Sequence, residues 1–126
     1  MTYEVDDVNL RLIMSKIFYV SITGLRVKSV WRLPAFWWHA SAAMQQAMNA
    51  QGCLGAEARL IGGVHHTRSV WTDRQSMKDY LQSGAHLKAI KAFRDIATGK
   101  TLGFDAESIP DWDEVHRLWH QKARVY

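Results

Sequence analysis

Apolar and polar residues alternate along residues 17–28, which is the pattern of a half-buried β-strand. Phe18, Val20 and Ile22 fall on one side of this strand, and Tyr19, Ser21 and Thr23 fall on the other. Gly24 predicts either a bulge or a close approach of backbone. The stretch therefore predicts a strand with one face toward a core.

A second alternating stretch, Val64 to Trp71, follows the turn signal at residues 62–63. Residues 54–60, before the turn, alternate more loosely. Residues 54–60 and 64–71, joined by this turn, together predict a β-hairpin. One face of the second strand carries Thr67, Ser69 and Trp71, and the other carries His66, Arg68 and Val70.

Residues 33–50 predict one amphipathic helix between these strands. Pro34 suits the first turn, where its missing N–H is not needed, and Gln51-Gly52 suits the end. The apolar face at helical spacing consists of Leu33, Phe36, Ala40, Ala43, Met44 and Ala47. Trp38 falls on the polar side and His39 at its edge. We therefore expect Trp38 to meet a partner subunit or a ligand rather than the core.

Two further helices follow the hairpin and are separated by Ser83-Gly84. Thr72, with Gln75 three residues later, forms a capping box that begins the first of them. The second covers residues 85–97, and its apolar stripe consists of His86, Ile90, Phe93 and Ala97. His86 thus opens a buried stripe.

The end of the chain predicts a short strand over residues 102–107 and a helix after Pro110-Asp111 that turns Trp112, Val115 and Trp119 inward. The resulting order is βαββαβ with an extra C-terminal helix, which indicates an α+β, ferredoxin-like fold with its helices on one face of the sheet. The other face would then be bare. Since exposed apolar surface costs roughly 25 cal/mol per Å², we expect a face-to-face homodimer.

Composition limits the class of protein. The chain has 126 residues, of which 48% are hydrophobic and 22% are charged, as in one globular domain. We assign residues 17–126 to this domain and residues 1–16 to an N-terminal arm. The single cysteine excludes an internal disulfide. No apolar run is long enough to span a membrane and the acidic start is unlike a signal peptide, so we expect a cytoplasmic protein without membrane contact.

The net charge of +4 comes from scattered basic residues without a basic face interleaved with aromatics, so we expect no nucleic-acid partner. No glycine-rich phosphate-binding motif and no nucleophile-elbow motif is present. The six tryptophans are more informative, because aromatic side chains at this density indicate a subunit interface or an aromatic-lined pocket.

Several segments carry a resemblance to a known group of proteins: Thr67–Asp73, Met77–Tyr80, Ser83–Ile90, Ser21–Leu25, Arg32–Pro34 and Ile109–Trp112. Over residues 17–120 the chain resembles the dimeric α/β-barrel superfamily. Within it the antibiotic-biosynthesis-monooxygenase and spheroidene-monooxygenase-like groups are the most similar.

This resemblance implies a homodimeric α/β barrel with a ligand cavity between sheet and helices. The superfamily includes cofactor-free monooxygenases of aromatic polyketides and haem-binding proteins, some of which degrade haem. In haem-binding members a histidine in the helix after the third strand can ligate the haem, and His86 lies in a similar region. Haem degradation would also require an asparagine in the first strand, where this chain has Tyr19, Ser21 and Thr23.

We therefore expect a small monooxygenase that binds a planar aromatic or apolar ligand without a cofactor. His39 or His86 would act as the base. Arg32 would hold the substrate anion, and Trp37 and Trp71 would stack on the ring. The full set of ligand-binding candidates is Arg32, Trp37, Trp38, Thr67 and Trp71. A non-enzymatic ligand-binding or haem-binding protein of the same fold is the alternative.

Each candidate also has an ordinary structural explanation. His86 can bond to the preceding turn, Trp71 can pack on the following helix, and Arg32 can flank a helix in solvent. His116 and His120 have the i, i+4 spacing that permits two-point metal binding, but no third ligand is evident. We therefore expect no metal site.

Overall fold

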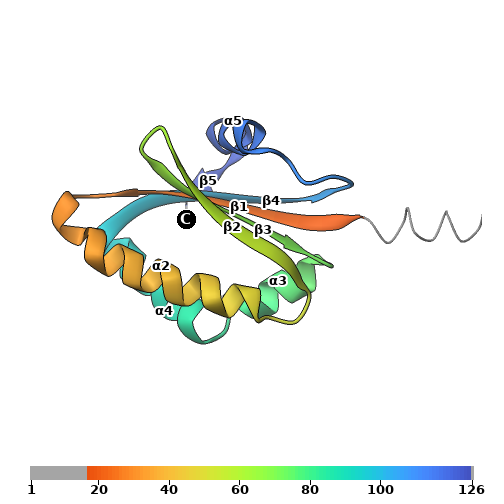
Figure 1. Cartoon of the computed structure of the whole chain (residues 1–126), viewed down its shortest axis with the longest axis horizontal. Coiled ribbons are helices and arrows are strands. Elements are labelled where there is room, and N and C mark those ends of the chain that lie inside the picture. Colours follow the sequence, from red (N-terminus) through yellow and green to blue (C-terminus); the bar gives the residue numbers. More distant parts are fainter. Residues whose placement is uncertain (1–16, 126) are drawn as a thin grey trace, which may run out of the picture.

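The computed structural model describes residues 17–125, so the expected N-terminal arm lies outside the described residues. Its centre is a five-stranded antiparallel sheet in the order β2-β3-β1-β4-β5. The strands are β1 (Phe18–Val27), β2 (Cys53–Ile61), β3 (Val64–Trp71), β4 (Ala97–Ala106) and β5 (Arg124–Val125). Figure 1 shows helices on both sides of this sheet.

β1 lies in the middle of the sheet because strands on both sides pair with it. It pairs with β3 from Tyr19 to Leu25 and with β4 along its whole length. Since successive side chains point to opposite faces, Ser21 and Thr23 face one helical layer while Val20 and Ile22 face the other.

The helices on the first face are α2 (Leu33–Met48), α3 (Arg74–Leu81) and α4 (Gly84–Ile96), and the short helix η1 (Val30–Arg32) precedes α2. α2 packs with the side that its helical spacing predicts, since Phe36, Ala43 and Ala47 are buried. The Phe36 ring lies 5.3 Å from that of Phe93 in α4, measured between ring centroids. These contacts hold the two long helices together over the sheet.

α5 (Trp112–Lys122) lies on the opposite face of the sheet (Figure 1). Its Val115 and Trp119 are buried with Val20 and Ile22 of β1. The expectation that this face is bare is therefore wrong. The inward-facing side of α5 needs an apolar surface to cover, and the sheet face away from the other helices supplies it.

The element order from β1 to β4 is βαββαβ, with the second helix split into α3 and α4 and with α5 added at the end. This confirms the expected α+β, ferredoxin-like fold.

Several boundaries differ from the sequence expectation, and η1 and β5 were not predicted; two of the differences have a clear physical cause. The carboxylate of Asp73 accepts a hydrogen bond from the Ser76 N–H at 2.8 Å, so Asp73 rather than Thr72 caps α3. β4 begins at Ala97, directly after α4, rather than at Leu102. Pairing with the whole of β1 satisfies backbone groups that a loop would leave to water, and this outweighs the local preference for a turn.

Candidate functional site

A cavity of about 1130 Å³ lies between the sheet and the layer formed by α2, α3 and α4. It extends past β4 to the C-terminal elements, where Leu118, Lys122 and Arg124 also line it. Since small-molecule pockets measure about 300–1,000 Å³, this cavity has room for a ligand of several fused rings.

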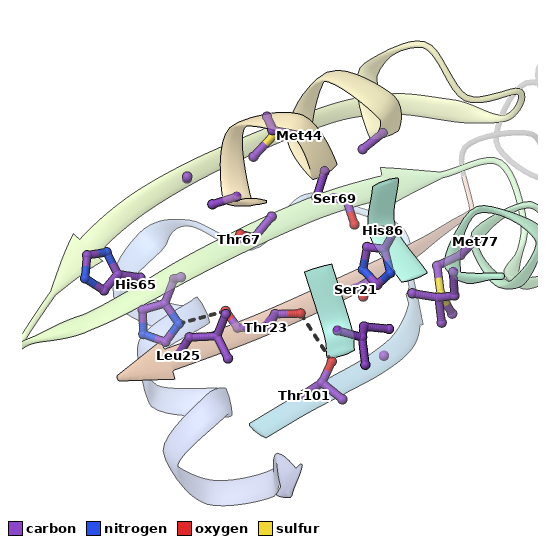
Figure 2. Close-up of a pocket in the computed structure, with 18 of the residues that line it drawn as sticks. Ser21, Thr23, Leu25, Met44, His65, Thr67, Ser69, Met77, His86 and Thr101 are labelled. Carbon is purple, nitrogen blue, oxygen red and sulfur yellow. Dashed lines mark hydrogen bonds between the residues drawn. The ribbon is translucent and has the colours of Figure 1, made fainter. Parts of the chain in front are cut away.

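The sheet side of the cavity carries hydroxyl groups from three strands, beside apolar residues such as Leu25 and Leu60. The hydroxyl groups belong to Ser21, Thr23, Thr67, Ser69 and Thr101 (Figure 2). The sheet register places Thr23 directly between Thr67 and Thr101. Thr101 Oγ1 donates to the Ile22 carbonyl at 3.0 Å and lies 3.4 Å from Thr23 Oγ1. The sheet therefore presents a row of positioned donors and acceptors.

The helix side of the same cavity is mainly apolar, although Ser41, Gln45 and Arg74 also line it. It is lined by Phe36, Ala40, Ala43, Met44, Ala47, Met77, Ile90 and Phe93. A flat molecule in the cavity would therefore meet hydrocarbon on its helix side and hydroxyl groups on its sheet side.

His86 lies in the first turn of α4, and its ring lies over the strands near Ser21 and Ser69 (Figure 2). Its centroid is 4.6 Å from that of Tyr80, with the two rings nearly edge to face. Burial lowers the pKa of His86 to about 4, an effect partly offset by the backbone of Leu81, so the imidazole is neutral at pH 7. Its Nδ1 is buried and makes no hydrogen bond within the described residues. A buried nitrogen left unpaired costs about 1–3 kcal/mol, so a ligand hydroxyl at this point would be stabilised.

Of the other predicted residues, Trp37 and Thr67 also line the cavity. Trp37 is half exposed at its edge, with its ring 5.3 Å from that of His65. Trp71 is fully buried and does not line the cavity; its Nε1 donates to Ser69 Oγ at 2.9 Å, so it supports a lining residue.

Three predicted residues lie away from this cavity. His39 is half buried on α2, with its ring 6.4 Å from that of Phe93. Arg32 donates to the Asp95 carbonyl at 3.1 Å on the exposed side of η1. Trp38 is 76% exposed. The structure therefore does not bring these three side chains to His86.

Most residues on the sheet side of the cavity were not predicted as site residues, and neither was His65. Alternation shows that Ser21 and Thr23 share a face of their strand, but no local signal shows that the large helices cover this face. Thr101 lies before the predicted last strand, so no pattern marked it. His65 packs with its ring 4.6 Å from Phe36, and burial lowers its pKa.

Within residues 17–125, no group of three or more histidine, cysteine or carboxylate side chains is arranged to hold a metal ion. Cys53 is partly buried, which raises the pKa of its thiol. None of the helices described has the length and apolar character needed to span a bilayer.

The ferredoxin-like fold of this chain is shared with solved structures that include a cofactor-independent oxygenase and a protein suggested to be an antibiotic biosynthesis monooxygenase. SnoaB, a cofactor-independent oxygenase from Streptomyces nogalater, is 18% identical with a TM-score of 0.60, over 75% of this chain and 99% of its own. A protein from Nitrosomonas europaea suggested to be an antibiotic biosynthesis monooxygenase is 14% identical with a TM-score of 0.63, over 72% of this chain and 89% of its own.

A conserved protein of unknown function from Bacteroides thetaiotaomicron, suggested to be an oxidoreductase, is 11% identical with a TM-score of 0.65, over 72% of this chain and 99% of its own. No protein-family model and no curated protein matches the sequence. At these identities the solved structures establish a shared fold.

Proposed function

We propose that this protein is a small monooxygenase that binds a planar, largely apolar aromatic molecule in the cavity and oxidises it with O2 without a cofactor. The observation that carries the proposal is His86, which lines the cavity and whose buried Nδ1 has no hydrogen-bond partner among the described residues. The shared fold with a cofactor-independent oxygenase supports it.

The two sides of the cavity make different kinds of contact with the bound molecule. Phe36, Met44 and Phe93 supply dispersion and hydrophobic contact to a flat ring system. Ser21 and Thr67 supply hydrogen bonds to oxygens at the edge of the ring. A planar molecule with hydroxyl or carbonyl groups on one edge satisfies both sides at once.

The pKa of His86 limits the kind of proton transfer that it can perform. An ordinary phenol has a pKa near 10, about six units above that of His86, so full transfer would cost roughly 8 kcal/mol. His86 therefore accepts a hydrogen bond from the substrate hydroxyl. It favours substrates whose hydroxyl is acidified by a neighbouring carbonyl, because the resulting anion and imidazolium stabilise each other in an apolar site.

The oxidation balances without an external reductant when the substrate supplies the electrons. A ring CH2 group activated by the adjacent phenolate becomes C=O; one atom of O2 enters the carbonyl, and the other leaves as water with the two hydrogens. The chain's part is to hold the ring, exclude water and stabilise the anion.

Oxygen uptake with a hydroxylated anthrone as probe tests this function. We expect His86→Gln to lower kcat/KM by about 100-fold or more, which is the usual contribution of a positioned acid–base group. Lys88→Gln, an exposed change on the same helix, is the matched control and should leave uptake unchanged. If His39→Gln rather than His86→Gln lowered oxygen uptake, the acid–base role would belong to His39. Saturable binding without oxygen uptake would support the non-enzymatic alternative.

Haem binding is the second candidate, and the same neutral imidazole favours it, because an axial ligand must be unprotonated. The test is a Soret band on mixing with haem that His86→Ala abolishes. A spectrum unchanged by that substitution would exclude His86 as the ligand.

We also infer that the chain forms a homodimer. Trp31 and Trp38 are 88% and 76% exposed, and α2 carries no charged residue along its length. α5 occupies part of the sheet face that was expected to pack against a second copy of the chain. The surface formed by Trp31 and Trp38 is therefore the better candidate for the contact between the two copies.

A further inference from the structure

Three histidines form a hydrogen-bonded chain on the α5 side of the sheet. His66 Nδ1 lies 3.3 Å from the Thr23 carbonyl oxygen, and His66 Nε2 lies 2.7 Å from His116 Nδ1. His116 Nε2 in turn lies 3.1 Å from His120 Nε2. Since His66 is buried and His120 is exposed, the three hydrogen-bonded histidines lead from the sheet to the surface.

The carbonyl at the inner end determines where the protons lie. A carbonyl only accepts, so His66 Nδ1 carries the hydrogen that it donates to Thr23. In a neutral imidazole one nitrogen carries the hydrogen and the other accepts, so His66 Nε2 is left as a lone pair.

His116 must then donate its Nδ1–H to His66, because two lone pairs at 2.7 Å would repel. A neutral His116 ring has only this one hydrogen to donate. The second nitrogen of His116, Nε2, is therefore left as a lone pair that points toward His120.

The two outer nitrogens are already spaced as a chelating pair. Two imidazole nitrogens bound side by side to one metal ion at about 2.0–2.1 Å lie roughly 2.9–3.4 Å apart. The Nε2 atoms of His116 and His120 are 3.1 Å apart. His120 is exposed, so its proton can move to Nδ1 and bond to water, which frees Nε2.

We propose that His116 and His120 form a binding site for a divalent transition-metal ion, with water completing the coordination and His66 positioning the His116 ring. The site lies on α5 and is independent of the function proposed for the cavity. We expect copper(II) to bind most tightly, because the affinity of nitrogen donors for divalent ions of this series is highest for copper. The nearby Arg26 opposes a cation, so we expect a modest, micromolar affinity.

Titration of the full chain with Cu(II) tests the site. The Trp119 ring lies 5.0 Å from that of His120 and 6.3 Å from that of His116, so bound copper quenches Trp119 fluorescence. We expect saturable quenching at one copper per chain and electron paramagnetic resonance with nitrogen hyperfine coupling. His116→Ala and His120→Ala should each weaken binding at least about tenfold. The control His39→Ala, which removes a histidine with no histidine one turn away, should bind as the unchanged chain does.

A second comparison tests the positioning role of His66. His66→Phe removes the acceptor for His116 Nδ1–H and should weaken copper binding about tenfold, whereas His66→Gln, whose amide oxygen can accept that hydrogen, should restore part of it. Circular dichroism checks that both variants fold. Equal copper affinity in the unchanged chain, His116→Ala and His120→Ala would overturn the site. Equal affinity in folded His66→Phe would overturn the positioning role.

Discussion

His66 and His86 are held on opposite faces of the sheet, and burial lowers the pKa of each to about 4. A neutral imidazole has one nitrogen that donates and one that accepts, and the groups around the ring determine which nitrogen carries the hydrogen. The carbonyl of Thr23 makes this decision for His66. For His86 the backbone of Leu81 acts on the ring, and Nδ1 has no hydrogen-bond partner among the described residues.

These shifts predict how stability depends on pH. The unfolded chain binds a proton at each of these histidines near pH 6.5, whereas the folded chain does so only near pH 4. Unfolded chains thus hold more protons in this window, and the free energy of unfolding should fall as the pH decreases from 6.5 toward 4.

Urea unfolding at a series of pH values measures this dependence. His86→Phe should show a shallower decrease than the unchanged chain, since one of the two groups is gone. Lys88→Gln should retain the full decrease. A free energy of unfolding that stays constant from pH 7 to 5 would contradict the prediction.

At the scale of elements, α5 is attached to β1 by a fit between Trp119 and Gly24. Gly24 pairs regularly with both neighbouring strands, so there is no bulge. The Trp119 indole occupies the space where a Cβ atom at residue 24 would lie, and its Nε1 donates to the Lys100 carbonyl at 2.9 Å. The glycine thus marks a close approach, made by a side chain of α5.

Gly24→Ala should therefore destabilise the protein by about 1–3 kcal/mol, because a methyl group there forces Trp119 to move. Gly55→Ala is the matched control, since a Cβ atom at that strand position meets no atom within 4 Å. Thermal unfolding of the two variants gives the comparison. Equal melting temperatures would show that α5 is not held on this face by Trp119.

At the scale of the whole molecule, the sheet separates two chemically different sides. The cavity lies between the sheet and the large helices, and the histidine chain lies between the sheet and α5. The most exposed aromatic side chains, Trp31 and Trp38, lie on neither of these interfaces but on the outer surface of η1 and α2. Large apolar side chains in water at this exposure are typical of a contact surface.

Analytical ultracentrifugation should therefore find a species of twice the mass of one chain. Trp38→Ala should shift it toward monomer, whereas Met48→Ala, at an exposed position near the other end of α2, should not. A monomer at all concentrations for the unchanged chain would contradict the homodimer.

The cavity shows how far local patterns reach. The helical spacing of Phe36, Ala43 and Ala47 predicted the apolar side of α2, and the stripe opened by His86 predicted that this ring would be buried. Trp38 and Arg32 were predicted to bind a ligand because tryptophan can stack on rings and arginine can bind anions. The type of a side chain carries no information about its position in space.

Local patterns predicted the four long strands, the helices α2 to α5, their order and the buried side of α2, because alternation, helical spacing and turn residues act between neighbours along the chain. They did not predict η1 or β5, nor which face of β1 the large helices cover, where α5 packs and which polar groups meet. Thr23 and Thr101 are 78 residues apart, and His66 and His116 are 50 apart. Such pairs form only when the sheet register and the packing of α5 bring them together, and no local preference encodes either one.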